Sequence, residues 1–97
     1  MDSLQDEEKG TYVVTTESST RYWLDLYRRT LRRAPSFELD ALRRDGKDLD
    51  LVELLDCRVG HPLKVLINLN LPGVWLTTRE STPILLIEPG PKSALRP

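Results

Sequence analysis

The run of residues 63–71 constrains the fold of this chain more than any other stretch. Five apolar residues occupy its odd-numbered positions: Leu63, Val65, Ile67, Leu69 and Leu71. Polar side chains stand between them at every position except Leu66. A period of two predicts a β-strand with one buried face and one solvated face.

Turn signals follow this strand and divide the C-terminal half. Pro72-Gly73 suits the central positions of a type II turn, because proline presets one φ and glycine accepts the positive one. "VWLTT" (74–78) comes next, and "ILLI" (84–87) follows after the polar "RES" and Thr82-Pro83. The pattern predicts a three-stranded antiparallel meander.

Two further stretches upstream have strand character. "TYVVTT" (11–16) is rich in β-branched and aromatic residues, and "ESS" after it can turn the chain. Asp45-Gly46 lies between "ALRR" and "KDLDL" and is typical of a two-residue hairpin turn. The alternation of acids and leucines in 48–51 indicates a half-buried strand.

Residues 20–33 fit two structures. As a helix, they gather Trp23, Leu24, Tyr27 and Leu31 on one face and the arginines on the other, with Ser19 or Thr20 as N-cap. As a hairpin, "YRR" turns the chain, while Tyr22, Leu24 and Leu26 point one way and Trp23, Asp25 and Tyr27 the other. The hairpin is favoured, since the stretch is aromatic and 11–16 needs a backbone partner.

The whole chain has the size of one small domain. It has 97 residues, of which 39% are hydrophobic and 30% charged. We expect a single β domain over 11–88, an acidic tail at 1–10 and a proline-rich tail at 89–97. A core of this size is small, so association between copies would be a natural supplement. We predict an all-β fold, a small antiparallel and partly closed barrel or sandwich of six to eight short strands, with at most one short helix.

The chain resembles a known set of proteins over about residues 10–89. "SSTRYWLDLYRRTLRRAP", "LRRDGKDLDLVEL", "CRVGHPLKVLI" and "STPILLIEP" resemble uncharacterised small single-domain β proteins of actinobacteria and their phages. A tyrosine, an "LDL", a basic turn and an arginine-proline recur there in that order. The resemblance implies an all-β phage or actinobacterial accessory protein, and it implies no site residues because the set has no established activity.

Chemistry-bearing patterns are weak in this sequence. Cys57 and His61 form its one thiol–imidazole combination, and a third, orienting group is missing from it. The acids of 45–56 fail the spacing of a calcium loop, and the five glycines stand singly at turns. We therefore expect a protein that is not an enzyme and needs no cofactor or metal. The acidic N-terminus does not read as a signal peptide and the single cysteine excludes an internal disulfide, so we expect a cytoplasmic protein without a membrane segment.

Charge is distributed unevenly along the chain. Residues 21–44 carry seven arginines against three acids, whereas 45–56 carry five acids against one lysine. Arginine mixed with tyrosine and tryptophan is typical of the centres of protein interfaces. Six residues are the candidate contact set: Trp23, Tyr27, Arg28, Arg29, Arg32 and Arg33. Tyr22 and Trp75 are expected in the core instead.

The leading functional hypothesis is a non-catalytic protein-binding or regulatory module. The resemblance implies one form of it, a phage-encoded protein that acts on a host protein. The partner would be that host protein or a second copy of this chain. Two alternatives stay open: nucleic-acid binding through Arg28, Arg29, Arg32 and Arg33, and a self-assembling accessory or virion component whose edge strands pair between copies.

Overall fold

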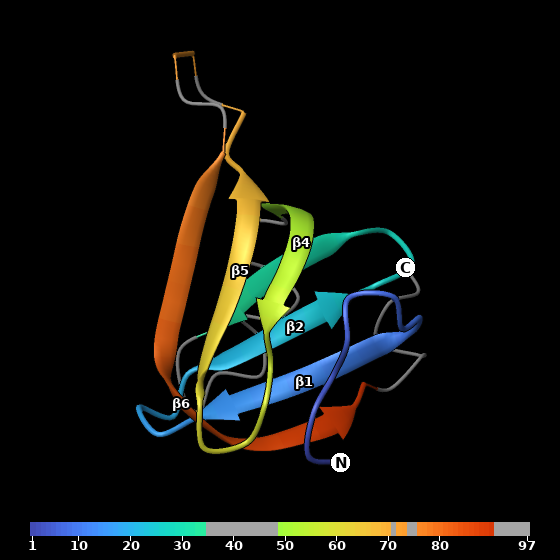
Figure 1. Ribbon diagram of the computed structural model, residues 1–97, viewed down its shortest axis with the longest axis vertical. Helices are drawn as coiled ribbons and strands as arrows, with labels where there is room; N and C mark the ends of the chain where they lie inside the picture. Colours follow the sequence, from blue (N-terminus) through green and yellow to red (C-terminus); the bar gives the residue numbers. More distant parts are fainter. Residues whose placement is uncertain (35–48, 71, 74–75, 91–97) are drawn as a thin grey trace.

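A computed structural model describes residues 1–34, 49–70, 72–73 and 76–90, and its strands close into a barrel (Figure 1). The six strands are β1 (Thr11–Thr16), β2 (Arg21–Asp25), β3 (Thr30–Ala34), β4 (Leu49–Asp56), β5 (Pro62–Asn68) and β6 (Thr77–Pro89). Each strand pairs antiparallel with the next, and β6 pairs back with β1. The described residues contain no helix, so the predicted all-β barrel is confirmed.

The ambiguous stretch is a hairpin, as favoured above. β2 and β3 pair in register from Arg21 opposite Ala34 to Asp25 opposite Thr30. The Asp25 carboxylate fixes the turn, because its Oδ1 accepts hydrogen bonds from the backbone N–H groups of Tyr27 and Arg28, both at 2.9 Å. Arg29 completes the turn with a φ of 58°.

The core fills the inside of the barrel with aliphatic side chains. β5 has the alternation predicted from its sequence: Leu63, Val65 and Ile67 are buried, and Lys64 between them is exposed. Leu24, Leu31, Ile84 and Ile87 come from other strands to the same cluster. β5 ends at Asn68, short of the predicted Leu71, and Gly73 has the positive φ (78°) that the Pro-Gly turn predicts.

β6 corrects the prediction that residues 74–87 contain two strands. It is a single strand of 13 residues, whose first part pairs with β5 and whose last part pairs with β1. "RES" and Thr82-Pro83 do not interrupt it but lie at a register shift. Hydroxyl groups satisfy the backbone there: Ser81 Oγ accepts from the N–H of Leu63 (3.0 Å) and Thr82 Oγ1 from the N–H of Ser18 (3.2 Å). One long strand can therefore change partners and close the barrel.

β4 departs from alternation in a regular way. Its register with β5 shifts between Leu51 and Glu53 and again between Leu54 and Asp56. Each shift is a β-bulge that places one extra residue, Val52 or Leu55, on β4. Burial along β4 consequently recurs every third residue, at Leu51 and Leu54, and continues at Cys57 beyond its end.

The first residues of the chain contact the barrel. Leu4 is buried in the core cluster, and its N–H donates to the carbonyl of Cys57 at 2.9 Å. Val59 N–H donates to the carbonyl of Asp2, so residues 2–4 run antiparallel to 57–59. No pattern in residues 1–10 predicted this packing, and the division at residue 10 stays a prediction.

Some predictions fall outside the described residues, namely the Asp45-Gly46 hairpin, the core position of Trp75 and the last part of the C-terminal tail. Across the described ranges, no helix is long and apolar enough to cross a membrane.

Candidate binding surface

The structure corrects the expectation that Trp23 is an exposed anchor. Trp23 lies on the outer side of β2, in register with Val13 and Arg32, yet only 8% of it is exposed. Among the described residues its indole is buried but lies outside the aliphatic cluster that fills the barrel, and its Nε1 has no hydrogen-bond partner there. A covered indole cannot serve as the first contact for a partner.

Arg29 has a structural role in this fold. Its guanidinium donates to Asp6 Oδ1 (2.6 Å), to the carbonyl of Asp6 (3.0 Å) and to the carbonyl of Val52 (3.1 Å). Asp6 Oδ1 also accepts from the backbone N–H of Leu54 at 2.7 Å. Burial raises the pKa of the Asp6 carboxyl, but the hydrogen bonds from Arg29 and Leu54 outweigh it and hold the pKa below its ordinary value. Arg29 thus ties the N-terminal segment to β4.

The other predicted residues divide between two places. Tyr27 (69% exposed) and Arg28 lie at the tip of the β2–β3 turn, where Arg28 Nε is 3.9 Å from Asp25 Oδ2. Arg32 and Arg33 lie on β3 toward its other end, with Arg33 in register with Tyr22. At about 3.3 Å per residue, four residues of strand separate Arg29 from Arg33 by roughly 13 Å. The hairpin does not gather the six residues into one cluster.

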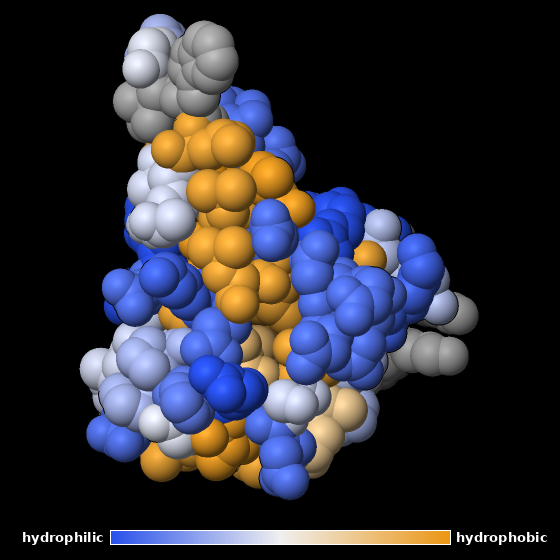
Figure 2. Space-filling view, viewed as in Figure 1, coloured by the Kyte–Doolittle hydropathy of each residue, from blue (hydrophilic) through white to orange (hydrophobic). Residues whose placement is uncertain are grey.

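A second surface, which was not among the predicted contact residues, lies on the outer wall of β4 and β5. The bulge residues Val52 (42% exposed) and Leu55 (41%) face solvent there. Leu66 of β5, in register with Glu53, is half-buried beside them. Figure 2 shows apolar side chains as a stripe over these strands. We call Val52, Leu55 and Leu66 the β4–β5 patch.

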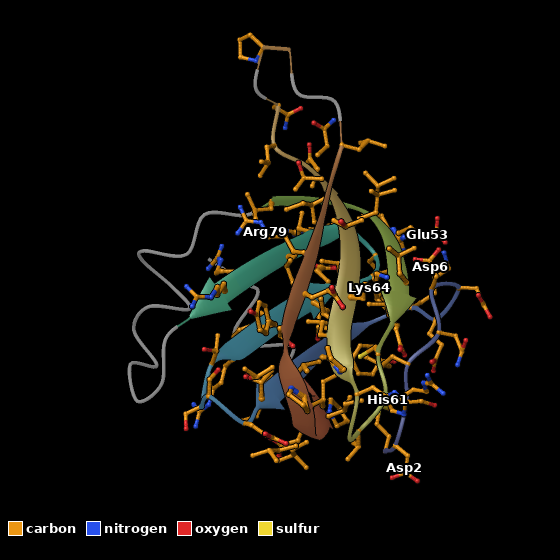
Figure 3. All side chains as sticks on the ribbon, turned by 60° about the vertical axis from the view of Figure 1, so that its left-hand side comes forward. Asp2, Asp6, Glu53, His61, Lys64 and Arg79 are labelled. Atoms are coloured by element: carbon orange, nitrogen blue, oxygen red, sulfur yellow. The ribbon has the colours of Figure 1, made fainter. Side chains whose placement is uncertain are left out.

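Charged residues border the β4–β5 patch. Lys64 of β5 pairs in register with Asp56 on one side and Glu80 on the other. Arg58 Nε donates to Asp56 Oδ1 at 2.9 Å, and this hydrogen bond lowers the pKa of the Asp56 carboxyl. Figure 3 shows Glu53 and Asp6 beside β4, and Arg79 on the other side of the view.

A shallow groove of about 580 Å³ adjoins the patch. It lies between the N-terminal segment and the end of β4, and its lining residues are Leu4, Gln5, Leu54, Leu55, Asp56, Cys57, Arg58 and Lys64. Cys57 is buried, and this burial raises the pKa of its thiol to about 12. The thiol is therefore protonated at neutral pH and is a poor nucleophile.

His61, the one histidine of the chain, is exposed, and its Nδ1 lies 3.4 Å from Arg58 Nη2. Among the described residues, no three histidine, cysteine or acidic side chains group as metal ligands would. The described residues offer an apolar surface with a charged border.

A signal for the patch was present in the sequence. The apolar residues of "LVELLDC" that enter the core, Leu51, Leu54 and Cys57, recur every three residues, which is neither a strand nor a helix period. Such spacing requires extra residues in the strand, and those residues point outward.

These features define a small antiparallel β-barrel with an apolar patch on its outer wall. Comparison of the chain with family models, with curated proteins and with solved structures finds no match. The resemblance to small actinobacterial and phage proteins stays a prediction.

Proposed function

We propose that this protein is a non-catalytic protein-binding module whose contact surface is the β4–β5 patch. The observation that carries the proposal is the pair of bulges in β4, which turns Leu55 outward on the same strand as the exposed Val52. Continued alternation from the buried Leu51 would have placed Leu55 inside the barrel.

The composition of this surface supports the proposal. Aliphatic residues form its centre, and charged residues such as Glu53 and Lys64 form its border. Protein interfaces have the same organisation, with an apolar centre that is dehydrated on binding and a polar rim. Each exposed leucine covered by a partner contributes on the order of 1 kcal/mol.

The alternatives raised by the sequence have less support. Nucleic-acid binding was an alternative based on four arginines. Of these, Arg29 donates a hydrogen bond to Asp6 (2.6 Å) and Arg28 lies 3.9 Å from Asp25. Phosphate contacts depend on cations that are free to replace counterions. Edge-to-edge assembly needs unpaired strand edges, whereas β5 is paired on both sides and the edge of β4 beyond its short pairing with β3 is bonded by Arg29 and Asp6.

The proposal is tested by capture of a protein from a lysate of the organism that encodes this chain. The immobilised wild type is compared with Leu55→Asn and with Leu86→Asn, a matched variant at an exposed leucine of β6 (46% exposed). We expect a captured protein that is lost with Leu55→Asn and retained with Leu86→Asn. Equal capture by Leu55→Asn would place the contact surface elsewhere, and a wild type that captures nothing would contradict the binding function.

A further inference from the structure

We propose that the segment which binds the β4–β5 patch is an amphipathic helix with apolar anchors flanked by lysine or arginine. This inference rests on the proposed function and names the chemistry of its partner.

The acidic border of the patch is the first argument. Asp50, Glu53 and Glu80 are exposed on the strands that carry the patch and on β6 beside it. Lys64 stands between Asp56 and Glu80, and Arg58 is engaged by Asp56. The cations of this face are therefore largely balanced by neighbouring acids, and an acidic excess is left.

The N-terminal segment extends this border along β4. The bond from Leu54 N–H to Asp6 holds the segment against the strand, and Figure 3 shows Asp6 close to Glu53. Asp6 itself is neutralised by Arg29 at 2.6 Å. Its neighbour Glu7 is exposed, and Glu8 is half-buried with Oε2 accepting from Gln5 N–H. Lys9 supplies one exposed positive charge against these two acids.

This charge distribution argues against a second copy as the occupant. Two copies packed face to face would enclose both acidic borders, each with Asp50, Glu53 and Glu80, in one interface. Like charges brought together in a partly dehydrated interface are costly, and opposite charges there favour association. A basic segment neutralises the border that a second copy would repel.

Strand pairing indicates the form of the segment. β5 is bonded to β4 on one side and β6 on the other, whereas β4 pairs with β3 only at Leu49 and Asp50. Beyond that pairing, Arg29 donates to the Val52 carbonyl and Asp6 accepts from the Leu54 N–H, so a partner meets side chains here and not a free backbone edge. An amphipathic helix presents an apolar stripe with charges on both flanks, and this arrangement matches an apolar patch with an acidic border.

The inference is tested with three labelled peptides and fluorescence anisotropy on the full chain. The first is a helical leucine–lysine peptide of about 14 residues with leucines at i, i+3, i+4 and i+7. The second replaces every lysine by glutamate, and the third keeps the lysines but replaces every leucine by glutamine. We expect binding of the leucine–lysine peptide alone.

Variants locate the binding on the surface. Leu55→Asn should weaken binding of the leucine–lysine peptide about tenfold, the loss of roughly one anchored leucine. Glu53→Lys should weaken it several-fold and reduce its dependence on salt, while the Leu86→Asn control should bind as the wild type does. Circular dichroism spectra of all variants should superimpose.

Each contrary outcome has a separate meaning. Equal binding of the leucine–glutamate peptide, or of the leucine–lysine peptide by Glu53→Lys, would overturn the basic character of the partner and leave the proposed function standing. Dimerisation in sedimentation experiments that Leu55→Asn abolishes would identify a second copy as the occupant instead. Capture from lysate that is insensitive to Leu55→Asn would overturn the proposed function itself.

Discussion

The contact between Asp6 and β4 allows a quantitative prediction. Asp6→Ala removes the acceptor for the Leu54 N–H and for one nitrogen of the Arg29 guanidinium. Arg29 keeps its bonds to the two carbonyls, so the loss is mainly that of one peptide N–H partner and one partly exposed ion pair. Such a peptide bond is worth about 0.5–1.5 kcal/mol, and such a pair less than about 1 kcal/mol. We expect a loss of about 1–2 kcal/mol in the free energy of unfolding.

Thermal unfolding followed by circular dichroism measures this loss. For a domain of this size, about 1 kcal/mol lowers Tm by roughly 4–8 °C, so Asp6→Ala should unfold at least about 4 °C below the wild type. Asp6→Asn should lose less, since its carbonyl oxygen still accepts from Leu54 N–H. The exposed Glu7→Ala is the matched control in the same segment and should unfold with the wild type.

The difference between wild type and Asp6→Ala should depend on pH. The pKa of Asp6 is lowered in the folded protein from its ordinary value of 3.8, so its contribution is present in full well above that value. The part that depends on the charge of Asp6 falls as the pH drops below 3.8 and is lost below the native pKa, while a protonated carboxyl can still accept from Leu54 N–H. Equal Tm values for wild type and Asp6→Ala at pH 7, or a gap as wide at pH 2 as at pH 7, would refute the reasoning.

Three further predictions concern the core and the turns. Ile67→Ala should lower the free energy of unfolding, measured by chemical denaturation, by about 2–5 kcal/mol. Thr78→Ala on the exposed side of β6 should lower it by less than about 0.5 kcal/mol. Similar losses for the two variants would contradict the inward direction of Ile67. The Cys57 thiol should react with a disulfide reagent at pH 8 only after denaturation, because burial raises its pKa to about 12, and rapid reaction of the native protein would contradict this burial. Gly73→Ala should cost about 1 kcal/mol because Gly73 has a φ of 78°, and an unchanged Tm would contradict that turn.

Strand positions were predictable where local patterns were strong. Alternation in 63–67 and the β-branched run at 11–16 indicated strands that the structure confirms. The hairpin of 20–33 was favoured because backbone groups of a strand need partners. Asp25 is a further local signal for this hairpin that was not used, since its carboxylate accepts hydrogen bonds from the backbone N–H groups of the turn.

The candidate surface was less predictable, because it depends on contacts between distant residues. Trp23 was expected outside on the basis of alternation, and it does lie on the outer side of β2, but it is covered all the same. Arg29 was named as a candidate contact residue, yet Asp6, 23 residues earlier in the chain, binds it. Neither fact can be read from neighbouring residues.

Bulges account for the remaining differences. An extra residue in a strand reverses the direction of every side chain after it, and single-sequence alternation assumes that no extra residue is present. Three pairs of consecutive residues that both point outward lie at register shifts: Val52 and Glu53, Leu55 and the half-buried Asp56, and Leu85 and Leu86. The exposure of Leu55, Leu85 and Leu86 accompanies that irregularity.

The central claim is that bulges in β4 turn Leu55 outward while Leu54 stays in the core, and cysteine labelling tests it most directly. Cys57 is the single cysteine of the chain and is buried, so Leu55→Cys and Leu54→Cys each add one thiol to a silent background. The bulged strand predicts that the native Leu55→Cys protein reacts rapidly with a maleimide and that Leu54→Cys reacts only on unfolding. A strand with strict alternation from the buried Leu51 gives the reverse order, and that result would contradict both the patch and the function proposed for it.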